Sequence, residues 1–207
     1  MRQSLIVLLS FLFLINSSYG QNASERPVRF GFGMNADIEF LDQDLANDQK
    51  IAATGLSYVD LHLRINAMKY INIDGGITIS HFKDKMSLAE AVTFTGGTLS
   101  GLPSEAGPVV SAMGFYYSLG ALIPIHPKLG IVAAAGNRHF TAKRKVSNCN
   151  DCEKTELDIN AGFYLQGGIA LLPLSEDTLS GQVRFLFTHY FEEAFKYSIG
   201  VGFTFVH

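Results

Sequence analysis

Ionisable side chains recur at alternate positions in several extended segments of this chain. Residues at every second position of a β-strand share one face of the sheet. If such strands enclose a narrow space, the charges on its inner face must pair, because an unpaired buried charge is costly. We therefore predict a network of ion pairs that plugs the interior, with a gated or weakly conducting channel as the alternative. By parity, the inner face carries Arg29, Asp37, Glu39, Asp60, His62, Arg64, Asp74, Asp158, Arg184 and Lys196, and Arg138 is a further candidate.

The two cysteines of the chain, Cys149 and Cys152, have the spacing of half a zinc site or of a redox motif. A zinc site needs a second pair of ligands and a redox motif needs a βαβ unit, and the sequence offers neither. In an exported protein the pair predicts a local disulfide that pins a loop. The remaining histidines lack metal-ligand spacing and no glycine loop for phosphate is present, so we predict no metal and no cofactor.

The segment from Arg138 to Thr141 places His139 two residues before a hydroxyl group, and Glu153 or Glu156 could orient the imidazole. A histidine beside a hydroxyl is the arrangement of an activated nucleophile. The segment resembles the His-x-Ser motif of outer-membrane lipid A 3-O-deacylases, which implies a lipid-modifying activity. However, a threonine replaces the serine, Ala142 replaces the asparagine, and the segment lies in the middle of the chain. We therefore predict no catalytic residues and interpret His139 as a residue near a strand end.

These residues are positioned by eight segments in which apolar and polar side chains alternate with the period of a strand. The first segment, 28–40, alternates without exception. The fifth is the least clear, because alanine and glycine dominate it. The segments span 28–40, 56–66, 70–83, 109–123, 129–143, 157–171, 182–191 and 195–205.

The connections between these segments alternate in length. Short connections are expected at 66–69, 124–128 and 173–178, and long ones at 41–53, 84–108 and 144–154, with 192–194 as a short exception. Long loops after odd strands collect at one end, and the two chain ends then lie at the other. Outer-membrane barrels have this plan, with short periplasmic turns and longer outer loops.

The composition is apolar, with 47% hydrophobic and 17% charged residues, against about 25% charged in a typical soluble domain. A net charge of -3 provides no electrostatic footprint for nucleic acid. The polar face of the segments is mostly Gly, Ser, Thr and Asn, and the apolar face carries Phe, Ile, Leu and Val. We predict an all-β, antiparallel, up-and-down transmembrane barrel of about eight strands. A soluble barrel with its apolar face around a ligand is the alternative.

The first residues form a separate segment. Arg2 precedes an apolar run from Leu5 to Ile15, and small or polar residues follow up to Gly20. The run is shorter than the roughly 20 apolar residues that a membrane-spanning helix needs. We predict that residues 1–20 are a cleaved signal peptide and that residues 21–207 form the barrel domain.

At the other end of the chain, one face of the last segment carries Tyr197, Ile199, Val201, Phe203, Phe205 and His207. This segment is similar to the C-terminal signal of small eight-stranded outer-membrane barrels, although His207 stands where phenylalanine is usual. The chain resembles the OmpX-like and OmpA-type barrel domains, without a peptidoglycan-binding domain. The resemblance implies recognition by the barrel-assembly machinery of a Gram-negative bacterium.

The leading functional hypothesis is a non-enzymatic, monomeric outer-membrane protein with a structural, surface-interaction or limited-permeability role. The expected partners are outer-membrane lipids, lipopolysaccharide and the barrel-assembly machinery, and a surface ligand could bind at loop 84–108. No nucleic-acid partner is expected. The alternatives are a deacylase-like enzyme acting on lipid A and a soluble, exported, lipocalin-like protein.

Overall fold

The computed structural model describes residues 29–66, 70–96, 98–99, 107–146, 149–150, 152–172, 180–192 and 194–206. The predicted signal peptide, residues 97 and 100–106 of the predicted loop 84–108, residues 67–69 and 173–178 of the predicted short connections, and His207 lie outside these residues. No helix in the described ranges is long and apolar enough to cross a bilayer.

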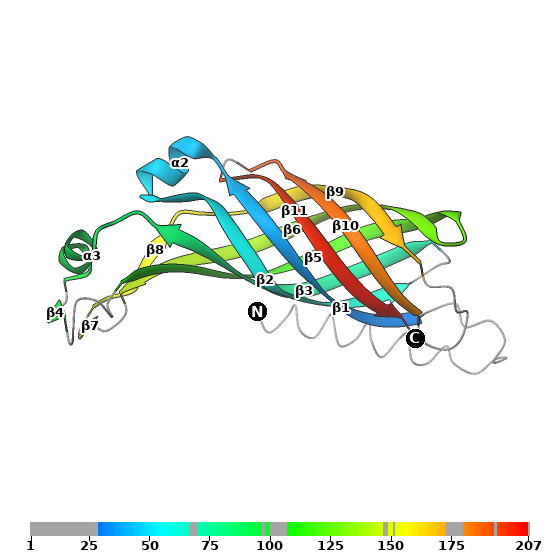
Figure 1. The fold of residues 1–207 in the computed structure, drawn as a ribbon, viewed down its shortest axis with the longest axis horizontal. Helices are drawn as coiled ribbons and strands as arrows, with labels where there is room; N and C mark the ends of the chain where they lie inside the picture. The colour runs from blue at the N-terminus through cyan, green and yellow to red at the C-terminus, as the bar shows by residue number, and fades with distance from the viewer. Residues whose placement is uncertain are drawn as a thin grey trace, which may run out of the picture.

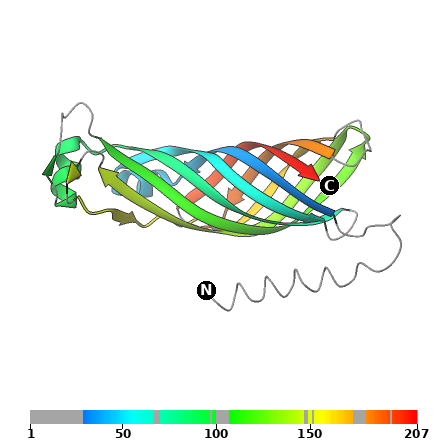
Figure 2. The same ribbon diagram turned by 90° about the horizontal axis from the view of Figure 1, so that it is seen from below.

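Eight strands of the described residues close into one antiparallel ring (Figures 1 and 2). Each strand pairs with the next one along the ring, and β1 pairs with β11 to close it. The fold therefore confirms the predicted up-and-down barrel. The ring strands are β1 (Arg29–Leu41), β2 (Ile51–Asn66), β3 (Ile71–Asp84), β5 (Pro108–His126), β6 (Leu129–Val146), β9 (Gly162–Leu171), β10 (Ser180–Tyr190) and β11 (Phe195–Val206).

Most of the large apolar side chains on these strands point outward. Exposed Phe, Ile, Leu, Met or Tyr residues occur on every strand of the ring. The fractional exposure is 71% for Leu63, 57% for Phe32 and 55% for Phe115. Their polar neighbours, such as His62 and Arg64, are buried inside. This orientation is opposite to that of a soluble ligand-binding barrel, whose apolar face points inward.

Short elements cover one end of the ring, which we call the loop end (Figure 1). They are α2 (Gln43–Asp48), α3 (Leu88–Thr95), the pair of β4 (Thr98–Leu99) with β7 (Cys149–Asn150), and β8 (Thr155–Leu157), which pairs with β6. The C-terminal end of β11 lies at the opposite end, the turn end (Figure 1). The predicted separation of long connections from the C-terminal end of the chain is therefore confirmed.

The two helices were not expected from the strand pattern, and local capping explains both. The Asp42 side chain accepts hydrogen bonds from the backbone N–H groups of Asp44 and Leu45 at the start of α2. The hydrogen bond from Leu45 and that from the Lys196 ammonium lower the pKa of Asp42. Ser87 and Glu90 form a reciprocal capping box at the start of α3. Such signals extend over only one helical turn and are easily hidden between strands.

The sixth predicted strand is interrupted by a bulge at Gly162. The register with β6 changes between the pair of Ala142 with Leu157 and the pair of Arg138 with Gly162. Gly162 has a φ of 59°, a left-handed conformation that favours glycine. Because a one-residue change of register moves side chains to the other face, Leu157 is buried and Asp158 is exposed. The inward prediction for Asp158 was therefore wrong.

Replacing Gly162 by alanine tests this bulge. The added methyl group would occupy the space of the Glu192 side chain and would impose a left-handed φ on an L-residue. We expect the free energy of unfolding, measured by urea titration in detergent micelles, to fall by roughly 1–2 kcal/mol. Gly167→Ala is the control, because nothing lies within 4 Å of its added methyl group. An equal response of the two variants would contradict the assigned role of Gly162.

Candidate functional site: the barrel interior

The interior of the ring is divided into layers. Near the loop end, an apolar cluster fills the space between the strands, with Ile51, Phe82, Val110, Phe140 and Phe195 among its members. A smaller apolar cluster of Val132, Ala170 and Leu186 lines one wall farther from the loop end. Along β2 and β3, the buried polar residues are followed by Ile51 and Phe82 as the strands reach the loop end. The interior is thus less polar than the alternating pattern predicts.

Arg64 and Asp74 form a bidentate ion pair inside the barrel. Arg64 Nε and Nη2 lie 2.7 and 2.6 Å from the two carboxylate oxygens of Asp74. The Asn72 amide donates a third hydrogen bond to Asp74 at 3.1 Å. Arg64 and Asp74 are 2% and 7% exposed, so this pair is shielded from solvent and strongly oriented.

Arg184 extends this pair across the interior. Its Nη1 lies 3.9 Å from Asp74 Oδ2, and its Nη2 lies 3.3 Å from Asn35 Oδ1 and 3.0 Å from His62 Nε2. His62 Nε2 is also 3.2 Å from Thr204 Oγ1. One buried guanidinium therefore connects β10 to β1, β2 and β3.

Arg138 forms a second centre, which connects β6 to β1, β3 and β10. Its Nη2 lies 2.6 Å from Glu39 Oε1, and its Nη1 donates to the Tyr190 hydroxyl at 2.9 Å. Nη2 also donates to Thr78 Oγ1 at 2.9 Å. The guanidinium lies over the Phe140 ring, 4.6 Å from its centroid, where the polar layer meets the apolar cluster. The sequence left the facing of Arg138 open, because alanine and glycine obscure the alternation of β6.

A third ion pair, Arg144 with Asp84, lies at the loop end and was not predicted. Arg144 Nε is 2.5 Å from Asp84 Oδ2, and its Nη2 donates to the Gln49 carbonyl at 2.5 Å. Both side chains are almost fully buried. The sequence assigned both residues to loops, whereas β3 and β6 continue past the predicted ends. Extending the alternation by one residue in each strand would have identified the pair.

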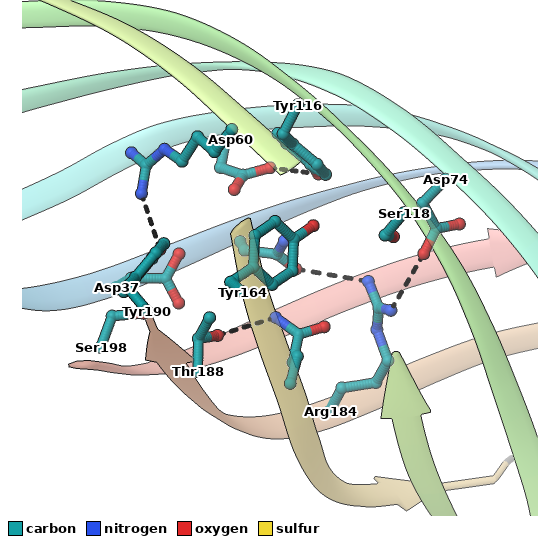
Figure 3. Close-up of a pocket in the computed structure, with 13 residues that line it drawn as sticks. Asp37, Asp60, Asp74, Tyr116, Ser118, Tyr164, Arg184, Thr188, Tyr190 and Ser198 are labelled. Atoms are coloured by element: carbon teal, nitrogen blue, oxygen red, sulfur yellow. Dashed lines mark hydrogen bonds and ion pairs between the residues drawn. The ribbon is translucent and has the colours of Figure 1, made fainter. Parts of the chain in front are cut away.

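A small cavity remains between the two arginine centres (Figure 3). Its volume of about 30 Å³ accommodates the centres of only a few water molecules. Asp60 faces it and accepts a hydrogen bond from the Tyr116 hydroxyl at 2.7 Å. Asp37, Tyr164 and Thr188 also line it. Arg138 and Arg184 are both among the residues that line it.

Seven of the ten residues predicted for the inner face lie there. Asp37, Glu39, Asp60, His62, Arg64, Asp74 and Arg184 are buried or line the cavity. Arg29 and Lys196 are exposed, like Asp158, and take no part in the network. Lys196 Nζ instead pairs with Asp42 Oδ2 at 3.1 Å near α2, because the bend before β11 places it at the rim. The inner-network prediction was therefore wrong for Arg29, Asp158 and Lys196.

The residues of the enzyme alternative do not form a catalytic group. His139 and Thr141 are exposed on the outer face of β6, and the His139 ring packs against Phe115 with centroids 4.8 Å apart. Glu156 Oε1 pairs with Lys143 at 2.8 Å rather than with the imidazole. Among the described residues, no group of three or more His, Cys, Asp or Glu could hold a metal ion. The Cys149 side chain lies outside the description, so the disulfide with Cys152 stays a prediction.

The closed antiparallel ring, with an apolar outer face and a charged inner layer, is the architecture of a small eight-stranded membrane barrel. No protein-family model and no curated protein sequence matches the chain. The fold resembles that of Neisserial surface protein A, with a TM-score of 0.51, 7% identity, and coverage of 84% of this chain and 95% of the other. This likeness concerns the fold alone.

A second solved structure of similar extent is Ail, the attachment invasion locus protein of Yersinia pestis, in complex with the heparin analogue sucrose octasulfate. Its TM-score is 0.47 at 9% identity, and the match covers 87% of this chain and 97% of the other.

Breaking the pair of Arg138 with Glu39 tests the inner network. Arg138→Met leaves the fully buried Glu39 without its charged partner, so we expect a loss of about 3–5 kcal/mol in the free energy of unfolding. The double variant Arg138→Met, Glu39→Leu should recover much of this loss, because it removes both charges. The exposed pair of Lys196 with Asp42 offers the control Lys196→Met, which should cost at most about 1 kcal/mol. Equal losses of unfolding free energy at both sites would show that the buried pair contributes no more to stability than the exposed pair.

Proposed function

We propose that the protein is an exported outer-membrane barrel with a closed interior, which holds its loop-end elements at the cell surface as an interaction surface. The observation that carries this proposal is the filled interior. Two buried arginine centres and an apolar cluster at the loop end occupy the space that a channel would need. Eight strands enclose only enough room for side chains, which is consistent with such filling.

The membrane location is supported by the outer face. Large apolar side chains are exposed on all eight ring strands. Soluble monomers rarely expose so large an apolar surface, because its contact with water is unfavourable. Closure of the ring satisfies the backbone of the strands without water, as a bilayer requires. The proposed signal peptide and the proposed assembly signal in β11 would deliver the chain to this membrane.

The interaction surface would consist of α2, α3, the β4–β7 pair and β8. These elements belong to three separate connections, and each is tied to the barrel or to another connection. Arg144 holds the Gln49 carbonyl after α2, and Lys50 Nζ lies 3.4 Å from Glu90 Oε1 in α3. A framework of this kind presents a defined shape to a partner. We assign no catalysis to these elements.

Fractionation after expression in a Gram-negative host tests the location. We expect the full chain in the outer membrane, with a band on SDS gels that shifts when the sample is boiled, because a closed barrel resists the detergent until heated. A matched sample of Arg138→Met should shift at a lower temperature. A protein that stays in the aqueous fraction without detergent, and shows no shift, would instead support the soluble alternative.

Planar-bilayer recording tests the closed interior. The purified barrel should give no steady conductance steps, because paired charges and the apolar cluster block the path. Phe140→Ala with Phe195→Ala removes two rings of that cluster and should produce small or flickering currents. The heat-dependent band shift verifies that this variant is folded. Steady steps from the wild-type barrel would overturn the closed interior and favour the limited-permeability role.

A further inference from the structure

Three lysines stand on the outer face of β3 and β6 at the loop end, and we call Lys83, Lys143 and Lys145 the basic rim. The strand register brings them together. His81 of β3 is opposite Ser111 of β5, and Ser111 is opposite Lys143 of β6. Lys83 follows His81 on the same face of β3, and Lys145 follows Lys143 on the same face of β6. The chain separates Lys83 from the other two by a long connection, so only the pairing of β3, β5 and β6 reveals the cluster.

The middle strand of this group leaves room between the lysines. Neighbouring strands lie about 4.8 Å apart, so β3 and β6 are about 10 Å apart across β5. At these rows β5 presents only Ser111 and Val109, which are small side chains. Lysine ammonium groups on flexible side chains can reach an anion above β5 from both neighbouring strands.

The basic rim borders the apolar belt directly. Closer to the turn end, β3 carries Ile77 and β5 carries Met113 and Phe115 on the outer face, and all three are exposed. At the rows of Met113 and Phe115, β6 carries Thr141 and His139. A ligand at this place would therefore meet positive charge at one end and an apolar wall at the other. That combination fits an amphiphile with an anionic head.

The nearby acidic groups leave a positive balance. Glu156 pairs with Lys143, but both side chains are largely exposed, at 70% and 45%, so solvent or a stronger anion can replace this contact. Asp84 is turned inward and is held by Arg144. On the opposite side of the loop end, Lys196 is paired with Asp42, and no comparable group of lysines occurs among the described residues there.

We propose that the basic rim binds the phosphate groups of an anionic lipid in the outer leaflet, while the acyl chains lie against Ile77, Met113 and Phe115. This inference rests on the proposed function, since it requires the loop end to lie in the outer leaflet. A phosphorylated glycolipid with several acyl chains satisfies both halves of the site. The lipid would anchor one side of the barrel and orient the loop-end elements above the membrane.

Native mass spectrometry of the full barrel released from mixed micelles tests the proposal, with bisphosphorylated lipid A and its phosphate-free form as probes. Each lysine near an anionic surface contributes about a fivefold factor. We expect Lys83→Gln with Lys143→Gln and Lys145→Gln to reduce retention of the bisphosphorylated lipid at least roughly tenfold. The phosphate-free lipid should bind weakly to both proteins.

A matched control removes three positive charges elsewhere, through Arg29→Gln, Lys128→Gln and Lys196→Gln, and should retain the lipid like the wild type. Equal loss in both triple variants, or equal retention of both lipids by the wild type, would overturn the site. The band shift on heating verifies that each variant is folded. If the wild-type protein conducts, or is absent from the outer membrane, the proposed function is contradicted. Failure of the lipid site and failure of the proposed function therefore give different results.

Discussion

The pairing of β1 with β11 is the interaction on which the rest of the structure depends. It extends from Gly31 opposite Val206 to Leu41 opposite Phe195, and it removes the two free edges that an open sheet would have. In hydrocarbon, each unpaired backbone N–H or C=O group would cost several kcal/mol. Once the ring is closed, its outer side chains are free to be apolar. The connections can then project only from its two ends.

Closure also creates a narrow interior, in which each side chain must fit the space left by its neighbours. Large polar side chains fit there because glycines stand opposite them. A methyl group added at Gly33 would collide with the His62 ring, and one added at Gly136 would collide with the Tyr164 ring. The charged groups then pair across the ring rather than along one strand, as the contacts of Arg138 with β1, β3 and β10 illustrate. The network therefore links strands that are distant in sequence.

The two faces of the barrel have different consequences for function. The interior holds two arginine centres and an apolar cluster, whereas the proposed interaction surface and the proposed lipid site lie at the loop end and on its outer rim. The buried Arg144 illustrates how the two are coupled, because it holds Asp84 and the chain after α2 from within the ring. A surface built in this way can keep its shape without a large loop domain.

The sequence by itself determined the period of two, the number of strands and the sorting of long and short connections. These features depend on local alternation and on turn chemistry, which neighbouring residues report directly. It also identified seven of the inner polar residues, since parity within an unbroken strand is enough to place them. The facing of Arg138 was left open because small residues on β6 carry little hydrophobic contrast.

Only the tertiary structure decided which charges meet and where parity breaks. Gly162 reverses the facing of residues 157–161, and nothing in the alternation marks the position of that bulge. The pairs of Arg138 with Glu39 and of Arg144 with Asp84 join residues whose separation in the chain is long. The grouping of Lys83 with Lys143 and Lys145 likewise follows from the register of β3, β5 and β6. Period-two patterns fix the face of a side chain, but the partner across the ring depends on register and closure, which are properties of all the strands together.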